Sequence, residues 1–352
     1  MNKEKLNNRP NNHKCELCKR AIADKTNSHI IPSFIVCKIA SSDGSGKRNH
    51  ELVYSIGKII QAYSGNEVPI EVMERNFDDL SEERINEELK KNTLAKDFVF
   101  CSSCEKALAD YLESPYSQKK QTDAKVAYFF WMSVIWRANH FGLSNSCMPK
   151  FMTTELRKSL DTCLQTKKDE ISTGNIHQKY PFNYRILTCK DYSKDGDGCI
   201  YAEYDKSNKI YNIVLGDNIV CFNFKCEDIP ENYSFLGLEH EFIQAPLNDG
   251  NKVEKERPVS KEIFSEAYKM LLEKAKTKYL ESEIEMIYRI WTGLKNQNWI
   301  APEPIPSNIF IQHCLKLIHD EKKKAGEKYT YKNFAISFAS ALKDVYGIQI
   351  SE

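Results

Sequence analysis

The pattern of apolar and polar positions changes character along the chain. Between residues 122 and 141, apolar side chains occupy nearly every side of a helix, which predicts a buried central helix. From residue 183 to residue 224, apolar residues alternate or run in short stretches between turn residues, which predicts an antiparallel β-meander. After Pro258 an apolar spacing of three and four residues returns and predicts a helical tail.

Upstream of this central helix, the pattern predicts only short elements, arranged around two pairs of cysteines. The first pair forms a tight knuckle, and the stretch 27–32 is a strand that Pro32 ends because proline lacks an amide donor. Residues 97–100 form a second short strand, and a helix is expected from Glu105 to about residue 112. This order of knuckle, two strands and helix is typical of a small ββα-metal module.

The predicted fold class is therefore α+β, in three regions. Residues 1–120 form a small zinc-pinned ββα-metal-like head, interrupted at about residues 50–95 by an acidic helical insertion. A mainly helical part follows, in which residues 121–258 hold the central helix and the meander, and residues 259–352 form a helical C-terminal region. The chain exceeds what one hydrophobic core usually organises, so division into more than one unit is expected.

Two Cys-x-x-Cys pairs are the strongest chemical signal. One pair is Cys15 and Cys18, and the other, far downstream, is Cys101 and Cys104. Four thiolates on two such hooks can surround one zinc ion tetrahedrally, at about 2.3 Å from the metal. In a reducing compartment disulfides are rare, so paired cysteines indicate metal ligation. The sequence predicts a structural zinc site with these four ligands.

Composition places the chain in a setting without assigning a function. The 41% hydrophobic and 28% charged residues are typical of a soluble globular protein. Residues 1–14 are polar and lack the apolar centre of a secretory signal. The longest apolar run, 127–136, is interrupted by Ser133 and is too short to cross a bilayer. We expect a cytoplasmic protein with no membrane partner.

Charge is distributed unevenly, although the formal net charge is only +1. Residues 1–50 carry ten Lys or Arg against four Asp or Glu, whereas residues 71–90 carry eight acidic against three basic groups. A basic zinc segment could face the phosphates of a nucleic acid. The acidic run is then either an insertion that turns away from the phosphates or shields the site, or simply a solvated helix face.

Between the two hooks stands Ser28-His29-Ile30-Ile31-Pro32, and Glu105 directly follows the second hook. Together with the cysteine pairs, these residues resemble the HNH endonuclease family, particularly a divergent bacterial branch. The resemblance covers roughly residues 13–112 and nothing beyond.

The resemblance implies a metal-dependent endonuclease that hydrolyses phosphodiester bonds in DNA, in a layout suited to bacterial antiviral defence. It assigns zinc to the four cysteines and the general-base role to His29, whose imidazole can accept a proton from water near neutral pH. Glu105 would be a ligand of a catalytic Mg²⁺ or Mn²⁺ ion. One carboxylate is an incomplete set of protein ligands for such an ion, and Asp97 or Asp110 could supply a second. Residues 121–352 would select the target or contact a protein partner.

The sequence also departs from the family pattern. Ser28 stands where the family commonly has an aspartate, Glu105 stands where it usually has a histidine, and its middle asparagine has no clear counterpart. These departures fit two alternatives: a catalytically inactive zinc module that binds nucleic acid or protein, and a structural subunit of a defence complex. In either case His29 would hydrogen-bond a backbone group or replace a thiolate as a zinc ligand.

Overall fold

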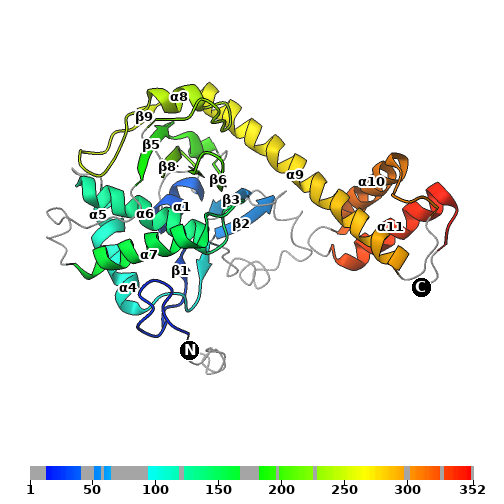
Figure 1. Ribbon diagram of the computed structural model, residues 1–352, viewed down its shortest axis with the longest axis horizontal. Coiled ribbons are helices and arrows are strands. Elements are labelled where there is room, and N and C mark those ends of the chain that lie inside the picture. Colours follow the sequence, from blue (N-terminus) through cyan, green and yellow to red (C-terminus); the bar gives the residue numbers. More distant parts are fainter. Residues whose placement is uncertain are drawn as a thin grey trace. The chain divides into compact units, whose positions relative to one another are not determined.

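The computed structural model describes residues 13–40, 51–56, 59–64, 94–118, 123–166, 182–195, 198–224, 228–296, 302–325 and 329–349. The fold is mixed, with helices and a predominantly antiparallel sheet (Figure 1). Contacts divide the chain into two compact units. The larger comprises Met1–Glu67 and Glu88–Leu271, and the smaller comprises Val68–Glu87 and Leu272–Glu352.

A sheet forms the centre of the larger unit. Among the described residues it has seven strands in the order β2-β3-β6-β7-β8-β5-β9, in which neighbours pair antiparallel except β5 and β9. The strands are β2 (Glu51–Ile56), β3 (Ile59–Ser64), β5 (Asn183–Thr188), β6 (Ile200–Asp205), β7 (Ile210–Leu215), β8 (Asn218–Asn223) and β9 (Arg257–Pro258). The expected meander is confirmed as β6-β7-β8, with β5 added beside β8.

Turn chemistry sets the register of this meander. Between β6 and β7, the Asp205 carboxylate accepts hydrogen bonds from the backbone amides of Ser207 and Asn208 at 2.9 and 3.2 Å. Between β7 and β8, Gly216 has a φ of +57°, which a glycine adopts without a steric penalty. The resulting hairpin pairs Leu215 with Asn218.

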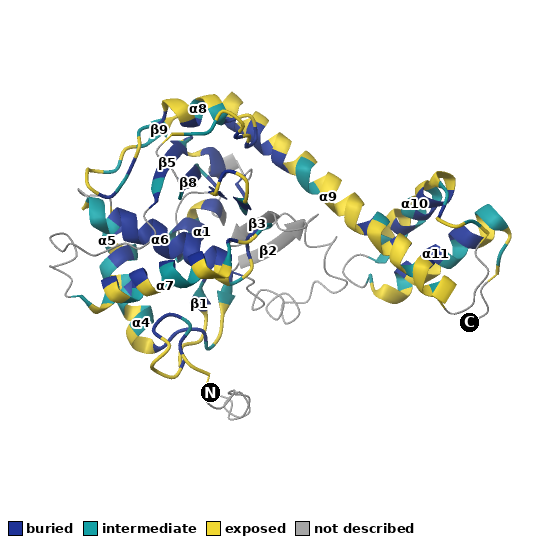
Figure 2. Ribbon diagram, in the orientation of Figure 1, coloured by how far each residue is buried: buried dark blue, intermediate teal, exposed yellow. Residues whose placement is uncertain are grey.

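One face of the sheet packs against helix α6 (Ala124–His140), the central helix expected from the sequence. α6 is buried along most of its length (Figure 2). Its Trp131 ring lies 5.9 Å from that of Phe222 on β8 and 6.3 Å from that of Tyr184 on β5. Residues 184 and 222 are paired across the two strands, so they project from the same face. The helix α7 (Lys150–Gln165), which sequence reasoning missed, packs beside α6.

The opposite face is covered by the segment that follows the meander. The Tyr233 hydroxyl donates to Asn212 Oδ1 at 2.7 Å, and Phe242 of α8 (Glu239–Gln244) packs near Tyr233. Tyr268, near the start of α9 (Lys261–Asn296), donates to the Gly216 carbonyl at 2.7 Å. Both sheet faces are therefore covered by packed side chains.

The head consists of short elements. β1 (Ser28–His29) pairs antiparallel with β4 (Ala95–Lys96), and α1 (Ser33–Ala40) follows β1. α4 (Ser102–Ala107) begins between Cys101 and Cys104 and continues into a π-helix (Leu108–Glu113) and α5 (Ser114–Gln118). The strand predicted at 97–100 is wrong. Pairing stops at Lys96 because the backbone turns at Phe98, which has a φ of +56°.

The contacts group the chain differently from the three predicted regions. One buried core runs from Cys15 in the head through α6 to Phe222 in the sheet, so residues 1–120 do not form a separate unit. The predicted helical insertion at about 50–95 is also corrected in part, because β2 and β3 are strands that join the main sheet. The rest of that prediction, at residues 50, 57–58 and 65–93, lies outside the described residues.

The smaller unit is helical where the structure describes it. It contains the C-terminal part of α9, together with α10 (Asn308–Ala325) and α11 (Tyr331–Tyr346). Trp291 of α9, Phe310 of α10 and Phe338 of α11 meet in its core. The predicted helical tail is thus confirmed. None of the helices in the described ranges is both long and apolar enough to cross a membrane.

Candidate metal centre and polar site

The two cysteine hooks are shaped by backbone hydrogen bonds. In the first, the Lys19 amide donates to the Cys15 carbonyl at 2.9 Å, and Lys19 has a φ of +58°, which closes a tight knuckle. In the second, Cys101 directly precedes α4 and its carbonyl accepts from the Glu105 amide at 3.0 Å. The Asp24 carboxylate joins the two hooks, because it accepts from both the amide and the hydroxyl of Ser102 at 2.6 and 2.8 Å.

The four sulfur atoms converge. The Sγ atoms of Cys15, Cys18, Cys101 and Cys104 all lie within 4.8 Å of one another, and those of Cys18 and Cys101 are 4.0 Å apart. Four sulfurs placed tetrahedrally at about 2.3 Å from zinc would lie about 3.8 Å from each other. The cluster therefore has the size that a zinc ion needs, although Cys15 and Cys101 are 86 positions apart in the sequence.

The electrostatics of the cluster favour a cation. A hydrogen bond from the Cys104 thiol lowers the pKa of Cys15 to about 5, against the effect of burial. The same contact, followed by burial, raises the pKa of Cys104 far above its ordinary value, and burial raises that of Cys101. Once Cys15 is ionised, it therefore opposes the ionisation of Cys104 and Cys101. A bound dication removes this conflict by stabilising several thiolates together.

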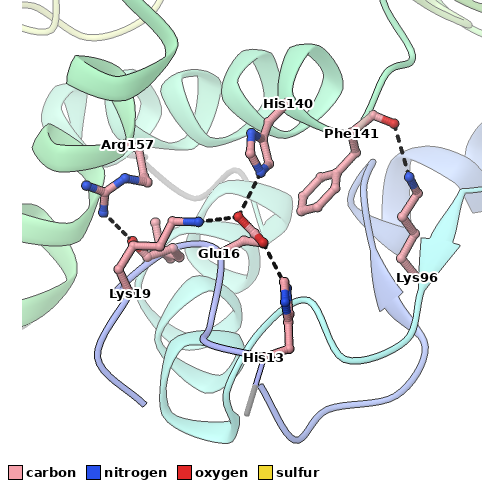
Figure 3. Close-up of polar contacts among 8 residues, drawn as sticks. His13, Glu16, Lys19, Lys96, His140, Phe141 and Arg157 are labelled. Carbon is pink, nitrogen blue, oxygen red and sulfur yellow. Dashed lines mark hydrogen bonds and ion pairs between the residues drawn. The ribbon is translucent and has the colours of Figure 1, made fainter. Parts of the chain in front are cut away.

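Glu16, inside the first hook, connects the cysteine cluster to the central helix. Its carboxylate is paired with His13 at 2.8 Å, with His140 of α6 at 3.1 Å and with Lys19 (Figure 3). Burial acts to raise the pKa of Glu16, but the hydrogen bonds from Lys19 and His140 outweigh it and lower the pKa. Charge-assisted contacts of Glu16 therefore stabilise the first hook, in addition to any metal bound by its two cysteines.

Helix α7 supports the same hook from another side. The Arg157 guanidinium donates to the Leu17 carbonyl at 2.6 Å, and Arg20 makes a two-point contact with Asp161 at 2.7 and 2.8 Å. Leu17 itself is fully buried. The head is consequently anchored to helices that the sequence assigned to another region.

His29 lies on β1, beside the hooks, and is half-buried. His29 pairs with Ala95 of β4, and the His29 carbonyl oxygen accepts a hydrogen bond of 2.9 Å from Nη1 of Arg137 on α6. The next residue, Ile30, donates its amide to the Leu94 carbonyl at 2.7 Å. The backbone that carries the imidazole is thus held from both sides.

Glu105 lies on α4, directly after the last cysteine. Burial raises the pKa of its carboxyl, although the neighbouring Ser28 hydroxyl and Arg137 guanidinium act to lower it. Its Oε2 atom is buried and has no hydrogen-bond partner within the described ranges. The carboxylate of Glu113 also acts on it and raises its pKa further. Glu105 therefore lies near Ser28 of β1, and Arg137 is a neighbour of both Glu105 and β1.

The acidic side chain that lies near Glu105 is neither Asp97 nor Asp110, the two residues suggested by the sequence. Asp97 accepts a hydrogen bond of 2.7 Å from the amide of Asn27, 70 positions away in sequence, and Asp110 is exposed. Glu113, at the end of the π-helix, is the acidic group near Glu105, and it forms a 2.7 Å ion pair with Arg137. A usable signal was Arg137 itself, because a charged residue inside an otherwise apolar helix must be paired.

Comparisons with known proteins did not identify relatives: no protein-family model, curated protein or solved structure matched the chain. The likeness to HNH endonucleases therefore rests on the residues quoted above.

Proposed function

We propose that the protein is a metal-dependent, HNH-like endonuclease that hydrolyses phosphodiester bonds in DNA. The observation that carries this proposal is the convergence of two distant segments beside the cysteine cluster. Ser28 and His29 arrive on β1, and Glu105 arrives on α4. Both segments adjoin the guanidinium of Arg137.

The side chains supply the groups that phosphodiester hydrolysis needs. His29 would take a proton from the attacking water, because an imidazole titrates near neutral pH. The unpartnered, buried Oε2 of Glu105 is a hard oxygen donor that fits Mg²⁺ or Mn²⁺. Such an ion would supply charge stabilisation at the phosphate. Glu113 is the nearby acidic group available as a further oxygen ligand.

Zinc has a different role in this proposal. Four thiolates leave no open coordination position, so the cysteine-bound ion would be structural and would hold the hooks together. The role in defence against phage rests on the resemblance to the bacterial HNH branch, whereas the cytoplasmic setting rests on the composition and cysteine usage of the sequence. Residues 121–352, which lie outside the resemblance, would select the target or contact a protein partner.

A zinc module without catalytic activity is the second candidate. The ion pair between Glu113 and Arg137 favours it, since a carboxylate already neutralised by a guanidinium is a weaker metal ligand. Ser28, at the position where the family commonly has an aspartate, points the same way.

Cleavage of supercoiled plasmid DNA with added Mg²⁺ or Mn²⁺ separates these candidates. The endonuclease proposal expects nicked or linear product from the wild-type protein, and its loss in His29→Ala with zinc content retained. His313→Ala is the matched control, because His313 pairs with Asp344 in the smaller unit and should not affect cleavage.

Two results would count against the proposal. Absence of cleavage with either ion favours the inactive zinc module. Loss of zinc in His29→Ala would show that His29 is a zinc ligand rather than a base.

A further inference from the structure

Arg137 is a fully buried arginine in the middle of the apolar helix α6, with 2% of its surface exposed. Its Nη1 atom donates to the His29 carbonyl at 2.9 Å, and its Nη2 atom donates to Glu113 Oε1 at 2.7 Å. The Nε atom donates to the carbonyl of Ser133, one helical turn earlier, at 3.4 Å. All three nitrogens of the guanidinium are therefore engaged.

These contacts hold two elements in a fixed relation. One branch of the guanidinium reaches β1, 108 positions away in sequence, and the other reaches the end of the π-helix. The planar fork of an arginine has a set angle between its branches, whereas the ammonium of a lysine is a single point. Arg137 thus determines where the His29 backbone lies relative to Glu113.

The helix that carries Arg137 is itself held rigidly. Asp123 caps its first turn by accepting from the amide of Lys125 at 2.8 Å. Near its other end, Trp136 is buried and its ring lies 6.1 Å from that of Phe100, next to Cys101. A donor on a helix locked by packing holds its acceptors more accurately than a donor on a loop.

We infer that Arg137 is a positioning residue for the reaction: it sets the placement of the His29 strand and of Glu113 around Glu105. This inference rests on the proposed endonuclease function, because placement matters to a reaction only if the site catalyses one. The positioning itself is a structural property and is measurable without catalysis. Arg137 would not touch the substrate.

Two variants test the role. Arg137→Lys keeps the charge but cannot bridge the two acceptors. The double variant Arg137→Met with Glu113→Gln removes both charges together, so that no buried carboxylate is left unpaired. Arg257→Lys is the control, because Arg257 also pairs with a carboxylate, that of Glu241 at 2.8 Å, but lies elsewhere in the larger unit.

The measurements are steady-state plasmid cleavage, zinc content and the histidine ring signals in NMR spectra of isotope-labelled protein. The His29 signal is assigned as the one missing in His29→Ala. We expect kcat to fall about a hundredfold in both variants, the loss typical of a displacement of about 1 Å, with KM unchanged. The His29 signal should shift, zinc should be retained, and Arg257→Lys should match the wild type.

An unshifted His29 signal in both variants overturns the inference, as does an unchanged kcat. Loss of zinc from both variants also overturns it, because Arg137 would then be needed for the fold in general. If the wild-type protein does not cleave DNA, the proposed function fails, but the His29 signal still decides whether Arg137 positions that strand.

Discussion

Removal of one thiolate from the cysteine cluster gives the sharpest test of the metal centre. In Cys101→Ala the remaining three sulfurs, on Cys15, Cys18 and Cys104, keep their surroundings, but tetrahedral coordination is incomplete. Cys101 is buried and directly precedes α4, so truncation of its side chain removes one sulfur from the enclosed cluster. The variant should therefore bind zinc more weakly and unfold more easily.

The magnitude follows from the number of ligands. A structural zinc site contributes about 10–16 kcal/mol, so one thiolate of four accounts for roughly 3 kcal/mol. That loss corresponds to about a hundredfold weaker zinc binding. For a unit of this size, about 3 kcal/mol lowers Tm by roughly 10 °C.

Zinc affinity is measured by competition with a chromophoric chelator, and stoichiometry by native mass spectrometry. Thermal unfolding is then recorded at a fixed free zinc concentration, because a bound ion raises apparent stability by mass action. Cys163→Ala is the matched control. Cys163 is also a fully buried cysteine, but it lies on α7 and outside the cluster, so this variant should keep the wild-type zinc affinity.

The reasoning would be refuted if Cys101→Ala bound zinc as tightly as the wild type. It would also be refuted if the wild-type protein, purified without chelator, contained no zinc. Equal losses of affinity in the Cys101 and Cys163 variants would point to a general effect of cavity formation.

Two further predictions concern the larger and the smaller unit. Burial raises the pKa of Glu254 above its ordinary 4.5, despite hydrogen bonds from Tyr116, Tyr184 and Trp131. The folded state therefore binds the carboxyl proton of Glu254 more tightly than the unfolded state does. The free energy of unfolding consequently falls as pH rises from the ordinary pKa of 4.5 through the raised pKa of the folded state. Glu254→Gln should flatten this part of the profile in urea titrations at several pH values, and an unchanged profile would contradict the assignment. Phe310→Ala, which removes a fully buried ring of the smaller unit, should lower the free energy of unfolding by about 3–5 kcal/mol in denaturant titrations followed by circular dichroism, with zinc content unchanged. A cost below about 1 kcal/mol would mean that the ring is not part of a packed core.

Helix α6 shows how well a sequence pattern predicts a local element and how little it says about its neighbours. Apolar residues on every side predicted a buried helix at 122–141, and the structure has it at Ala124–His140. The same pattern did not show that α6 packs against the sheet on one side and the head on another. An apolar surface is not directional, so it does not specify its partner.

The candidate site likewise has one part that the sequence predicts and one part that depends on the fold. Four cysteines at hook spacing predicted a shared cluster, because few arrangements other than a common metal account for two Cys-x-x-Cys pairs, and the sulfurs indeed converge. The second carboxylate was expected at Asp97 or Asp110, whereas Glu113 lies near Glu105. A π-helix sets the direction of that side chain, and sequence spacing based on regular helices does not anticipate it.

The features that depend on residues close together in the chain could therefore be predicted from the pattern: the knuckle, the central helix, the hairpins and the helical tail. Long-range packing, by contrast, brings β2 and β3 into the main sheet and joins the head and the sheet in one core. It also decided that Arg137 reaches both His29 and Glu113. The physical reason is that local periodicity and turn chemistry act within a few residues, whereas a buried charge takes whichever acceptors the folded backbone brings to it.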